Sequence, residues 1–493
     1  MSEETYQGIA MVVYFVAMIG IGVWAYYRTT TVNDYMLAGR ALGPAAAALS
    51  AGASDMSGWL LMGLPGALYL SGMVELWIAI GLSVGAWLNW KFVAPRLRAY
   101  TELAGDAITI PTFFGNRLRD STKALRLTAG VIILVFFTFY VSSGMVAGGK
   151  FFDASFGMDY RLGMVLVAAV VVLYTLVGGF LAVSYTDLVQ GLMMLAALVA
   201  VPLAGVVYVG GPVALYDIVV TLDPDAFKLW GATTTVMGVV SSAAWGLGYF
   251  GQPHIIVRFM AMRTPQEAVP ARRIGMGWMI LSCLGAAGTA LVGIAIFKRD
   301  EGILPDQETV FIALGQLLFH PLIAGFMLAA ILAAIMSTIS SQLLVTASAL
   351  VEDLYATFFP TGLTAKRGVL LSRGAVLAVA VVAAALAWEQ NDTILGLVAF
   401  AWAGFGAAFG PTVLLSLYWR GLSSWGALAG MVVGAVTVGV WGTMEGGIFD
   451  VYEILPGFLL NLLTALTVSS LTYRRNPEIE AEFDEQVRLL APA

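Results

Sequence analysis

Long uncharged apolar stretches recur along the whole chain and indicate its architecture. A helix needs about 20 apolar residues to cross a hydrocarbon layer roughly 30 Å thick. The pattern therefore predicts an all-α polytopic membrane protein with thirteen transmembrane helices, several of them long enough to be tilted or broken. The predicted spans are 7–27, 42–74, 76–95, 127–149, 162–183, 188–209, 232–254, 274–297, 321–349, 374–388, 393–418, 425–444 and 454–473.

Composition supports a single membrane domain. Of the 493 residues, 59% are hydrophobic and only 11% are charged, which is far more apolar than a soluble domain. The gaps between predicted spans are short, so we expect one transmembrane domain over residues 1–493. The first apolar stretch follows residues 1–8, which contain no basic residue, and it predicts a retained helix and not a signal peptide.

Basic residues are distributed unevenly between the predicted loops. With the N-terminus outside the cell, twenty of the 25 Lys and Arg residues fall on the cytoplasmic side. Cytoplasmic loops normally carry this excess, so the sequence predicts an outside N-terminus and a cytoplasmic C-terminus. The net charge of −6 gives no reason to expect a nucleic-acid partner.

Two predicted helices contain helix-weakening residues. The first has the stretch "GASDMSGW", in which Asp55 is the only charged residue between positions 42 and 73. The second, at residues 241–254, contains Gly246, Gly248, Gly251 and Pro253. Irregular backbone inside a membrane is tolerated where it is enclosed by protein or lines a cavity, so the breaks indicate a binding site. They lie five spans apart and cross in opposite directions, as an inverted repeat requires.

Each break taken alone also has an ordinary structural interpretation. Gly and Pro are frequent in transmembrane helices, so a single break could be a packing feature. A carboxylate within a span favours a functional centre. The three glycines satisfy G-x-G-x-x-G, but the dinucleotide motif needs a strand and a βαβ unit. We expect them to let a ligand approach exposed backbone.

Hydroxyl groups gather in the ninth predicted span. Ala334, Ser337, Thr338 and Ser341 share one helical face by their spacing. Such a face usually packs against another helix or bonds back to its own backbone. Beside a broken helix it can also supply oxygen ligands for a hard cation.

Three further features are weaker signals. Tyr140 is either a core aromatic or a phenol with a polar partner. Asp187 ends a predicted loop, where a solvated interfacial charge is the ordinary interpretation and a place in an ion pathway is the alternative. The small residues Gly426, Gly430 and Gly434 predict close helix packing.

Catalytic chemistry has little support in the sequence. His254 and His320 are the only histidines, and no phosphate-binding or metalloprotease motif occurs. The single cysteine, Cys283, cannot form an intramolecular disulfide. We therefore expect a non-enzyme without a cofactor.

The chain resembles the sodium:solute symporter family. The stretches that carry the resemblance are "DYMLAGR" (34–40), "GASDMSGWLLMGLPGA" (52–67), "GGFLAVSYTDLVQG" (178–191), "WGLGYFGQPHI" (245–255), "AAIMSTISSQLLV" (333–345) and "EDLY" (352–355). The resemblance implies five-plus-five inverted repeats of the leucine-transporter type, at about 42–209 and 232–418. One helix precedes this core and two follow it.

The resemblance also implies a function and its residues: Na⁺-coupled uptake of L-proline across a bacterial inner membrane, with no obligate protein partner. The implied sodium site comprises the carbonyls of Ala53 and Met56 together with Ala334, Ser337 and Thr338, and Asp55 matches the sodium-coupling aspartate. The implied proline pocket comprises Ser57, Gly58, Tyr140, Trp245, Tyr249 and Pro253. Trp245 and Tyr249 would form an apolar wall for the pyrrolidine ring, and so affect substrate affinity more than ion affinity.

Three alternatives stay open. The first is a symporter of another small solute such as pantothenate, a sugar or acetate. The second is a transporter-derived sensor, but related sensors carry a kinase region, and only about 20 residues follow the last predicted helix. The third is a channel, which saturable, concentrative uptake would exclude.

Overall fold

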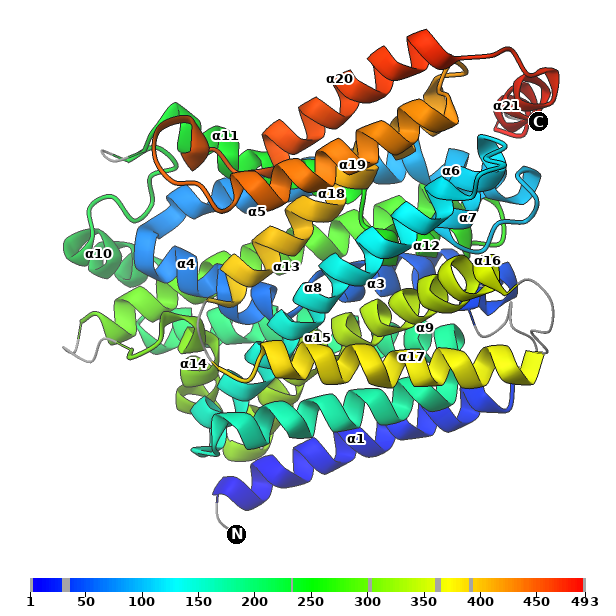
Figure 1. Cartoon of the computed structure of the whole chain (residues 1–493). Helices are drawn as coiled ribbons and strands as arrows, with labels where there is room; N and C mark the ends of the chain where they lie inside the picture. Colours follow the sequence, from blue (N-terminus) through cyan, green and yellow to red (C-terminus); the bar gives the residue numbers. More distant parts are fainter. Residues whose placement is uncertain are drawn as a thin grey trace.

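The computed structural model describes residues 3–28, 36–231, 234–299, 304–359, 365–389 and 393–490. Within these ranges the chain is helical and has no β-strand. Figure 1 shows most helices running in roughly the same direction across the molecule, with the two chain ends at opposite ends of the bundle. This confirms the predicted all-α architecture.

The helices divide into long ones that cross the bundle and short ones that make up broken helices and connections. The long helices are α1 (Glu3–Tyr26), α8 (Ala124–Phe156), α9 (Tyr160–Tyr208), α13 (Ala268–Phe297), α15 (Pro321–Ser348), α17 (Ala365–Leu386), α18 (Ile394–Tyr418), α19 (Ser424–Trp441) and α20 (Ile454–Thr472). The short helices are α3 (Pro44–Asp55), α4 (Leu64–Ser71), α5 (Leu76–Leu88), α6 (Ala94–Leu103), α7 (Ile110–Arg117), α10 (Pro212–Leu222), α11 (Val236–Ala244), α12 (Pro253–Met260), α14 (Val310–Leu318), α16 (Ala356–Phe358) and α21 (Pro477–Arg488).

Membrane-spanning character is clear, whereas the predicted number of spans is not settled. In the part of the chain that the structure describes, ten helices are long and apolar enough to cross a membrane. The number of spans depends on how broken and joined helices are counted. Helix α9 covers two predicted spans, and Gly179 interrupts its helical backbone with φ 60° and ψ −162°. Thirteen helices stays a prediction.

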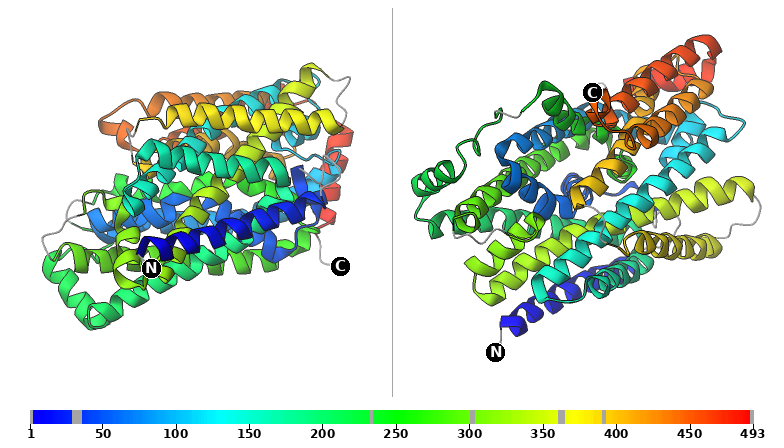
Figure 2. Two further views of the ribbon diagram at one scale, coloured as in Figure 1. Left: turned by 90° about the horizontal axis from the view of Figure 1, so that it is seen from below. Right: turned by 60° about the vertical axis from the view of Figure 1, so that its left-hand side comes forward.

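Helices α19 and α20 pack against each other and against α18 along one edge of the bundle, while α1 and α17 both contact α9 (Figure 2). Small residues bring α19 close to its neighbours. A Cβ atom on Gly426 would lie 1.9 Å from Ser469 Oγ, and one on Gly430 would lie 2.3 Å from Asn461 Oδ1. The predicted packing role of this glycine stretch is confirmed.

A buried ion pair fastens one end of the bundle. Lys150, which the span boundaries place just beyond a helix, lies inside α8, and its Nζ is 2.6 Å from Glu308 Oε2. The Glu308 carboxylate also accepts a hydrogen bond from the backbone N–H of Ile394, at 2.9 Å, and so caps the start of α18. This contact joins α8, α18 and the connection before α14.

Candidate functional site

The first predicted break is present. Helix α3 ends at Asp55, Met56 leaves the helical region with φ −85° and ψ 80°, and a helix resumes as the π-turn Trp59–Gly63 that leads into α4. The indole Nε1 of Trp59 donates a hydrogen bond to the Asp55 carbonyl at 3.2 Å. Because the chain is irregular here, carbonyl groups that a continuous helix would use are available to other partners.

The second predicted break is also present. After α11 the chain forms a 3₁₀ segment at Trp245–Phe250, leaves the helix at Gly251 and Gln252, and restarts as α12. Pro253 is the first residue of α12, where the missing N–H of proline costs nothing. The amide Nε2 of Gln252 donates a hydrogen bond to the Trp402 carbonyl at 3.0 Å, so α18 provides a hydrogen-bond acceptor for a side chain of the broken segment.

The role predicted for the glycines of this break is wrong. We expected them to expose backbone to a ligand, but they permit close contact with other helices. A Cβ atom on Gly246 would lie 2.2 Å from the Gly81 carbonyl oxygen of α5. One on Gly248 would lie 1.9 Å from the Trp402 indole, and one on Gly251 would lie 2.2 Å from the Phe405 carbonyl oxygen.

Four of the oxygen-bearing residues predicted for the cation site meet in the bundle interior. The Ser337 hydroxyl donates to the Ala53 carbonyl at 2.7 Å and to the Ala334 carbonyl at 3.0 Å. The Thr338 hydroxyl lies 3.5 Å from the Ala53 carbonyl and 3.3 Å from the Ala334 carbonyl. The last turn of α3 therefore faces the hydroxyl stripe of α15. Met56 follows directly and is buried.

Asp55 lies at the same break with its side chain buried. The Tyr249 hydroxyl donates to its Oδ2 atom, while Oδ1 has no hydrogen-bond partner among the residues that the structure describes. No cationic side chain among the described residues forms an ion pair with Asp55. A buried carboxylate without a counter-charge is costly, so this arrangement favours a mobile cation close by.

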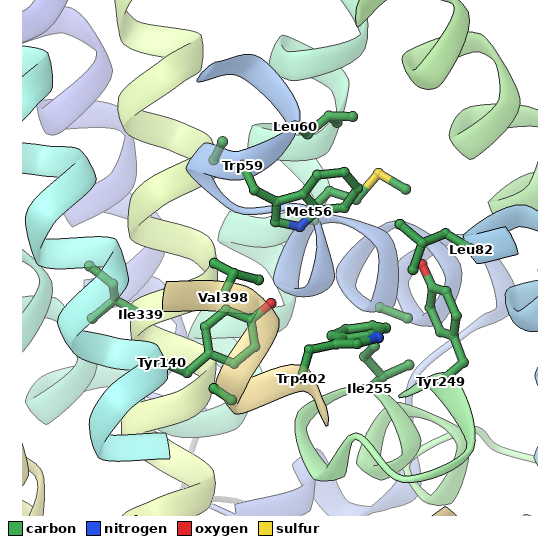
Figure 3. Packing of buried hydrophobic residues seen from close by; sticks show 14 of the residues in the cluster. Met56, Trp59, Leu60, Leu82, Tyr140, Tyr249, Ile255, Ile339, Val398 and Trp402 are labelled. Carbon is green, nitrogen blue, oxygen red and sulfur yellow. The ribbon is translucent and has the colours of Figure 1, made fainter. Parts of the chain in front are cut away.

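The aromatic residues predicted for the substrate pocket converge on α18. Trp402, which sequence reasoning missed, has its ring centroid 5.1 Å from that of Tyr249 and 6.4 Å from that of Trp245. Its indole Nε1 donates to the Trp245 carbonyl at 2.7 Å. In Figure 3, Trp402 appears between Tyr140 and Tyr249, beneath the segment that carries Met56 and Trp59.

The remaining predicted pocket residues border the same region. Tyr140 is buried in α8, and its ring packs edge-on against His254 at 5.7 Å. Its hydroxyl has no hydrogen-bond partner in the described part of the chain. Ser57 is buried beside the first break, and a Cβ atom on Gly58 would lie 3.0 Å from that of Ala147. An unpaired buried phenol needs a polar partner, which a ligand could provide.

The cavity beside the first break is small. It has a volume of about 20 Å³ and is bordered by Asp55, Met56 and Tyr249 together with Trp90 and Trp278. That volume suits one water-sized group and is too small for an amino acid. In this conformation the side chains therefore close around the broken helices.

Asp187 is not a solvated interfacial charge, so that interpretation is wrong. Its side chain is fully buried, and Oδ2 lies 3.1 Å from Arg258 Nη2. The same oxygen accepts a hydrogen bond from Ser50 at 2.7 Å, and Arg258 Nη2 also donates to Ser341 at 2.5 Å. The basic-residue count placed Arg258 in a loop, whereas it is a buried residue of α12. A role for Asp187 in an ion pathway stays a prediction.

Sequence comparison identifies relatives along nearly the whole chain. The profile of the sodium:solute symporter family matches residues 35–434. The chain is 58% identical over 469 residues to the high-affinity proline transporter PutP of Bacillus subtilis (strain 168), covering 95% of this chain and 98% of the relative. It is 49% identical over 494 residues to sodium/proline symporter 2 of Staphylococcus saprophyticus, covering 98% and 96%.

Structural comparison extends the likeness to the fold. A Na⁺-coupled sialic acid symporter in a substrate-bound outward-open state has a TM-score of 0.81 and 17% identity, with 96% of this chain and 99% of that chain covered. MHP1, a nucleobase-cation-symport-1 family transporter, has a TM-score of 0.52 and 17% identity, with 91% and 98% covered. These matches confirm the predicted leucine-transporter-type fold. With a family profile over most of its length and relatives of this identity, the chain belongs to the sodium:solute symporter family.

Proposed function

We propose that this protein is a secondary active transporter that couples inward Na⁺ movement to L-proline uptake by alternating access. Its curated relatives at 49–58% identity carry the names of proline transporters and sodium/proline symporters. The observation that carries the proposal is the 2.7 Å contact between Ser337 and the Ala53 carbonyl, next to a buried Asp55 that no cationic side chain neutralises within the described residues.

The sodium ion would replace the contacts that these oxygens now make with one another. Na⁺ is a hard cation and prefers oxygen ligands, which an unwound helix end and a hydroxyl stripe provide. We assign the Ala53, Met56 and Ala334 carbonyls and the Ser337 and Thr338 hydroxyls as ligands. Asp55 supplies the balancing negative charge.

Proline would occupy the space between the two broken helices once the aromatic side chains move apart. We assign its ring to the wall of Trp245 and Tyr249, to which the structure adds Trp402. Broken-helix backbone can receive its carboxylate. The other assigned residues are Ser57, Gly58, Tyr140 and Pro253.

We further propose the organisation of the chain in the membrane. The repeats would span about 42–209 and 232–418, with extra helices at 7–27, 425–444 and 454–473. The N-terminus would lie outside and the C-terminus in the cytoplasm of a bacterial inner membrane. The position of the two chain ends at opposite ends of the bundle fits termini on opposite sides of the membrane, and the distribution of basic residues supports the direction (Figure 1).

Radiolabelled proline uptake into proteoliposomes tests the proposal directly. We expect concentrative uptake with an imposed inward Na⁺ gradient and only equilibration without one. Excess unlabelled pantothenate, sugar or acetate should leave the uptake unchanged. Competition by one of these solutes, with weak competition by proline, would instead favour the alternative of a different substrate.

Transport is expected to be electrogenic, because zwitterionic proline adds no net charge to one Na⁺. A tenfold Na⁺ gradient supplies about 1.4 kcal/mol and a potential of about 100 mV supplies about 2.3 kcal/mol, together enough for roughly 500-fold accumulation. A potassium gradient with valinomycin sets the potential in proteoliposomes. Uptake that ignored this potential would contradict a net movement of charge.

Trp245 and Tyr249 are expected to differ when each is replaced. Trp245→Ala removes an aromatic wall and should raise the proline half-saturation concentration roughly tenfold or more. The Na⁺ half-saturation concentration should change little. Tyr249→Phe keeps the ring and removes the hydroxyl that donates to Asp55, so it should alter the Na⁺ half-saturation concentration. Kinetics measured at varied proline and varied Na⁺ separate the two effects. The assignment fails if Trp245→Ala changes only the Na⁺ value.

A further inference from the structure

A second cavity, of about 650 Å³, lies far from the helix breaks, at the end of the bundle where α21 docks. Three segments surround it: the connection between α7 and α8, the connection between α18 and α19, and the end of α20 with the linker to α21. Its volume is in the range of small-molecule binding sites. The transport cycle proposed above does not use this cavity.

The polar wall of this cavity favours an anion. Two arginines, Arg119 and Arg474, are among its 13 lining residues, and none of those residues is acidic. Arg119 is held by Glu482 at 2.5 Å and Glu478 at 3.5 Å, so its position is fixed and its charge is balanced by these carboxylates, which leaves Arg474 as the cation available to an anion. Within the described residues Arg474 forms no ion pair. Its guanidinium can therefore bind a phosphate oxygen pair in the bidentate geometry typical of arginine.

Hydrogen-bond donors stand on the same wall. Ser121 and Ser424 are among the lining residues, and Ser424 is the first residue of the 18-residue helix α19. The preceding Ser423 caps this helix by accepting a hydrogen bond from the Gly426 N–H at 3.0 Å. The remaining N–H groups of a first turn, with the positive end of the helix dipole, add to the attraction for an anion.

The opposite lip of the cavity is apolar and faces outward. Trp425 is 55% exposed and Leu471 is 81% exposed, although both belong to membrane-spanning helices. They continue the apolar outer faces of α19 and α20, where Val436 is 57% and Leu463 is 60% exposed. Tryptophan at a helix end typically marks the level of the lipid headgroups. The cavity thus opens where a bilayer changes from acyl chain to headgroup.

We propose that this cavity binds the phosphodiester headgroup of an anionic phospholipid. Arg474 and the start of α19 contact the phosphate, while the acyl chains follow Trp425 and Leu471. A free phosphate would use the polar wall and leave the apolar lip exposed, so the lip favours a lipid. The bound lipid would join α19 and α20 to the α7–α8 connection and stabilise this end of the bundle.

Adjacent arginines provide a matched test. Arg475 carries the same charge as Arg474, but it pairs with Glu480 at 3.2 Å and does not line the cavity. We would measure the thermal unfolding midpoint of the purified full-length protein in detergent with added phosphatidylglycerol or phosphatidylcholine, and count the retained lipids by native mass spectrometry. Phosphatidylglycerol should raise the midpoint of the parent and of Arg475→Gln above that with phosphatidylcholine. Arg474→Gln should lose most of this difference and retain fewer phosphatidylglycerol molecules.

The remaining measurements distinguish a bound lipid from a bound soluble phosphate compound. Leu471→Gln leaves Arg119 and Arg474 unchanged and makes the apolar lip more polar. It should therefore also reduce the rise of the unfolding midpoint that phosphatidylglycerol causes. Inorganic phosphate and glycerol 3-phosphate should not reproduce the effect at the same concentration. The proposal is overturned if these soluble anions reproduce it, if the two arginine variants lose it equally, or if the parent does not distinguish the two lipids.

Discussion

Replacing Asp55 by asparagine is expected to abolish Na⁺-driven proline uptake or to raise the Na⁺ half-saturation concentration on the order of a hundredfold or more. The side chain is buried, and its Oδ1 atom has no hydrogen-bond partner within the described ranges of the chain. Removing one member of a buried charge pair costs about 3–5 kcal/mol, which corresponds to that loss of affinity. Asparagine has nearly the same size and can still accept the Tyr249 hydrogen bond, so the change isolates the charge. Uptake at varied Na⁺ measures the effect.

Two other substitutions calibrate this result. Asp55→Glu keeps the charge on a longer side chain and should retain partial uptake. Ser337→Ala removes a neutral oxygen, whose hydrogen-bond-scale contribution is about 0.5–1.5 kcal/mol, so its Na⁺ requirement should rise less than that of Asp55→Asn. If Asp55→Asn transported proline at the parental Na⁺ half-saturation concentration, the carboxylate would be structural. The sodium site would then have to rest on carbonyl and hydroxyl oxygens alone.

Much of the architecture could be predicted because one physical rule controls it. A chain in lipid must satisfy its backbone hydrogen bonds internally, so long apolar stretches are helical, and residues that oppose a helix mark its interruptions. This rule located the breaks at Met56 and at Gly251–Gln252. The three-to-four spacing also placed Ser337 and Thr338 on one face, and the structure brings that face to the Ala53 carbonyl.

Contacts between distant helices could not be predicted in this way, because hydropathy does not specify which helices meet. Trp402 reads as an ordinary apolar residue of a span, although it lies 157 positions from Trp245, whose carbonyl accepts its hydrogen bond. Gly248 illustrates the same limit. Its lack of a side chain signalled a close approach, but only the fold shows that the approaching group is the Trp402 indole and not a ligand.

The position of Arg258 in the sequence could have indicated that it is buried, but the count of basic residues in loops obscured this. It follows the second break closely, and counting every basic residue near a span end as a loop residue assigned it to solvent. A buried guanidinium needs an acidic partner, and Asp187 was a carboxylate at the edge of another predicted span. Pairing unexplained charges within the apolar part of the chain could have suggested this contact.

The second large effect is expected when the Arg258 charge is removed alone. Arg258→Met leaves the Asp187 carboxylate fully buried with only hydroxyl partners, at a cost of about 3–5 kcal/mol, a large part of a typical folding free energy. The double variant Asp187→Asn with Arg258→Met removes both charges and should recover most of the lost stability, because replacing a buried pair entirely is often nearly neutral. Thermal unfolding of the four purified proteins measures the coupling between the two residues.

Proline uptake by the double variant then separates a structural role from a transport role. Ser50 and Ser341, which contact the pair, lie on α3 and α15, the same helices that bring Ala53 and Ser337 together. If the ion pair only fastens these helices, a stable double variant should transport proline with the parental Na⁺ dependence. If Asp187 belongs to the ion pathway, the double variant should fold and yet need more Na⁺ or fail to transport. A double variant as unstable as Arg258→Met would contradict the charge argument, since neither buried charge would then be present to cause the loss.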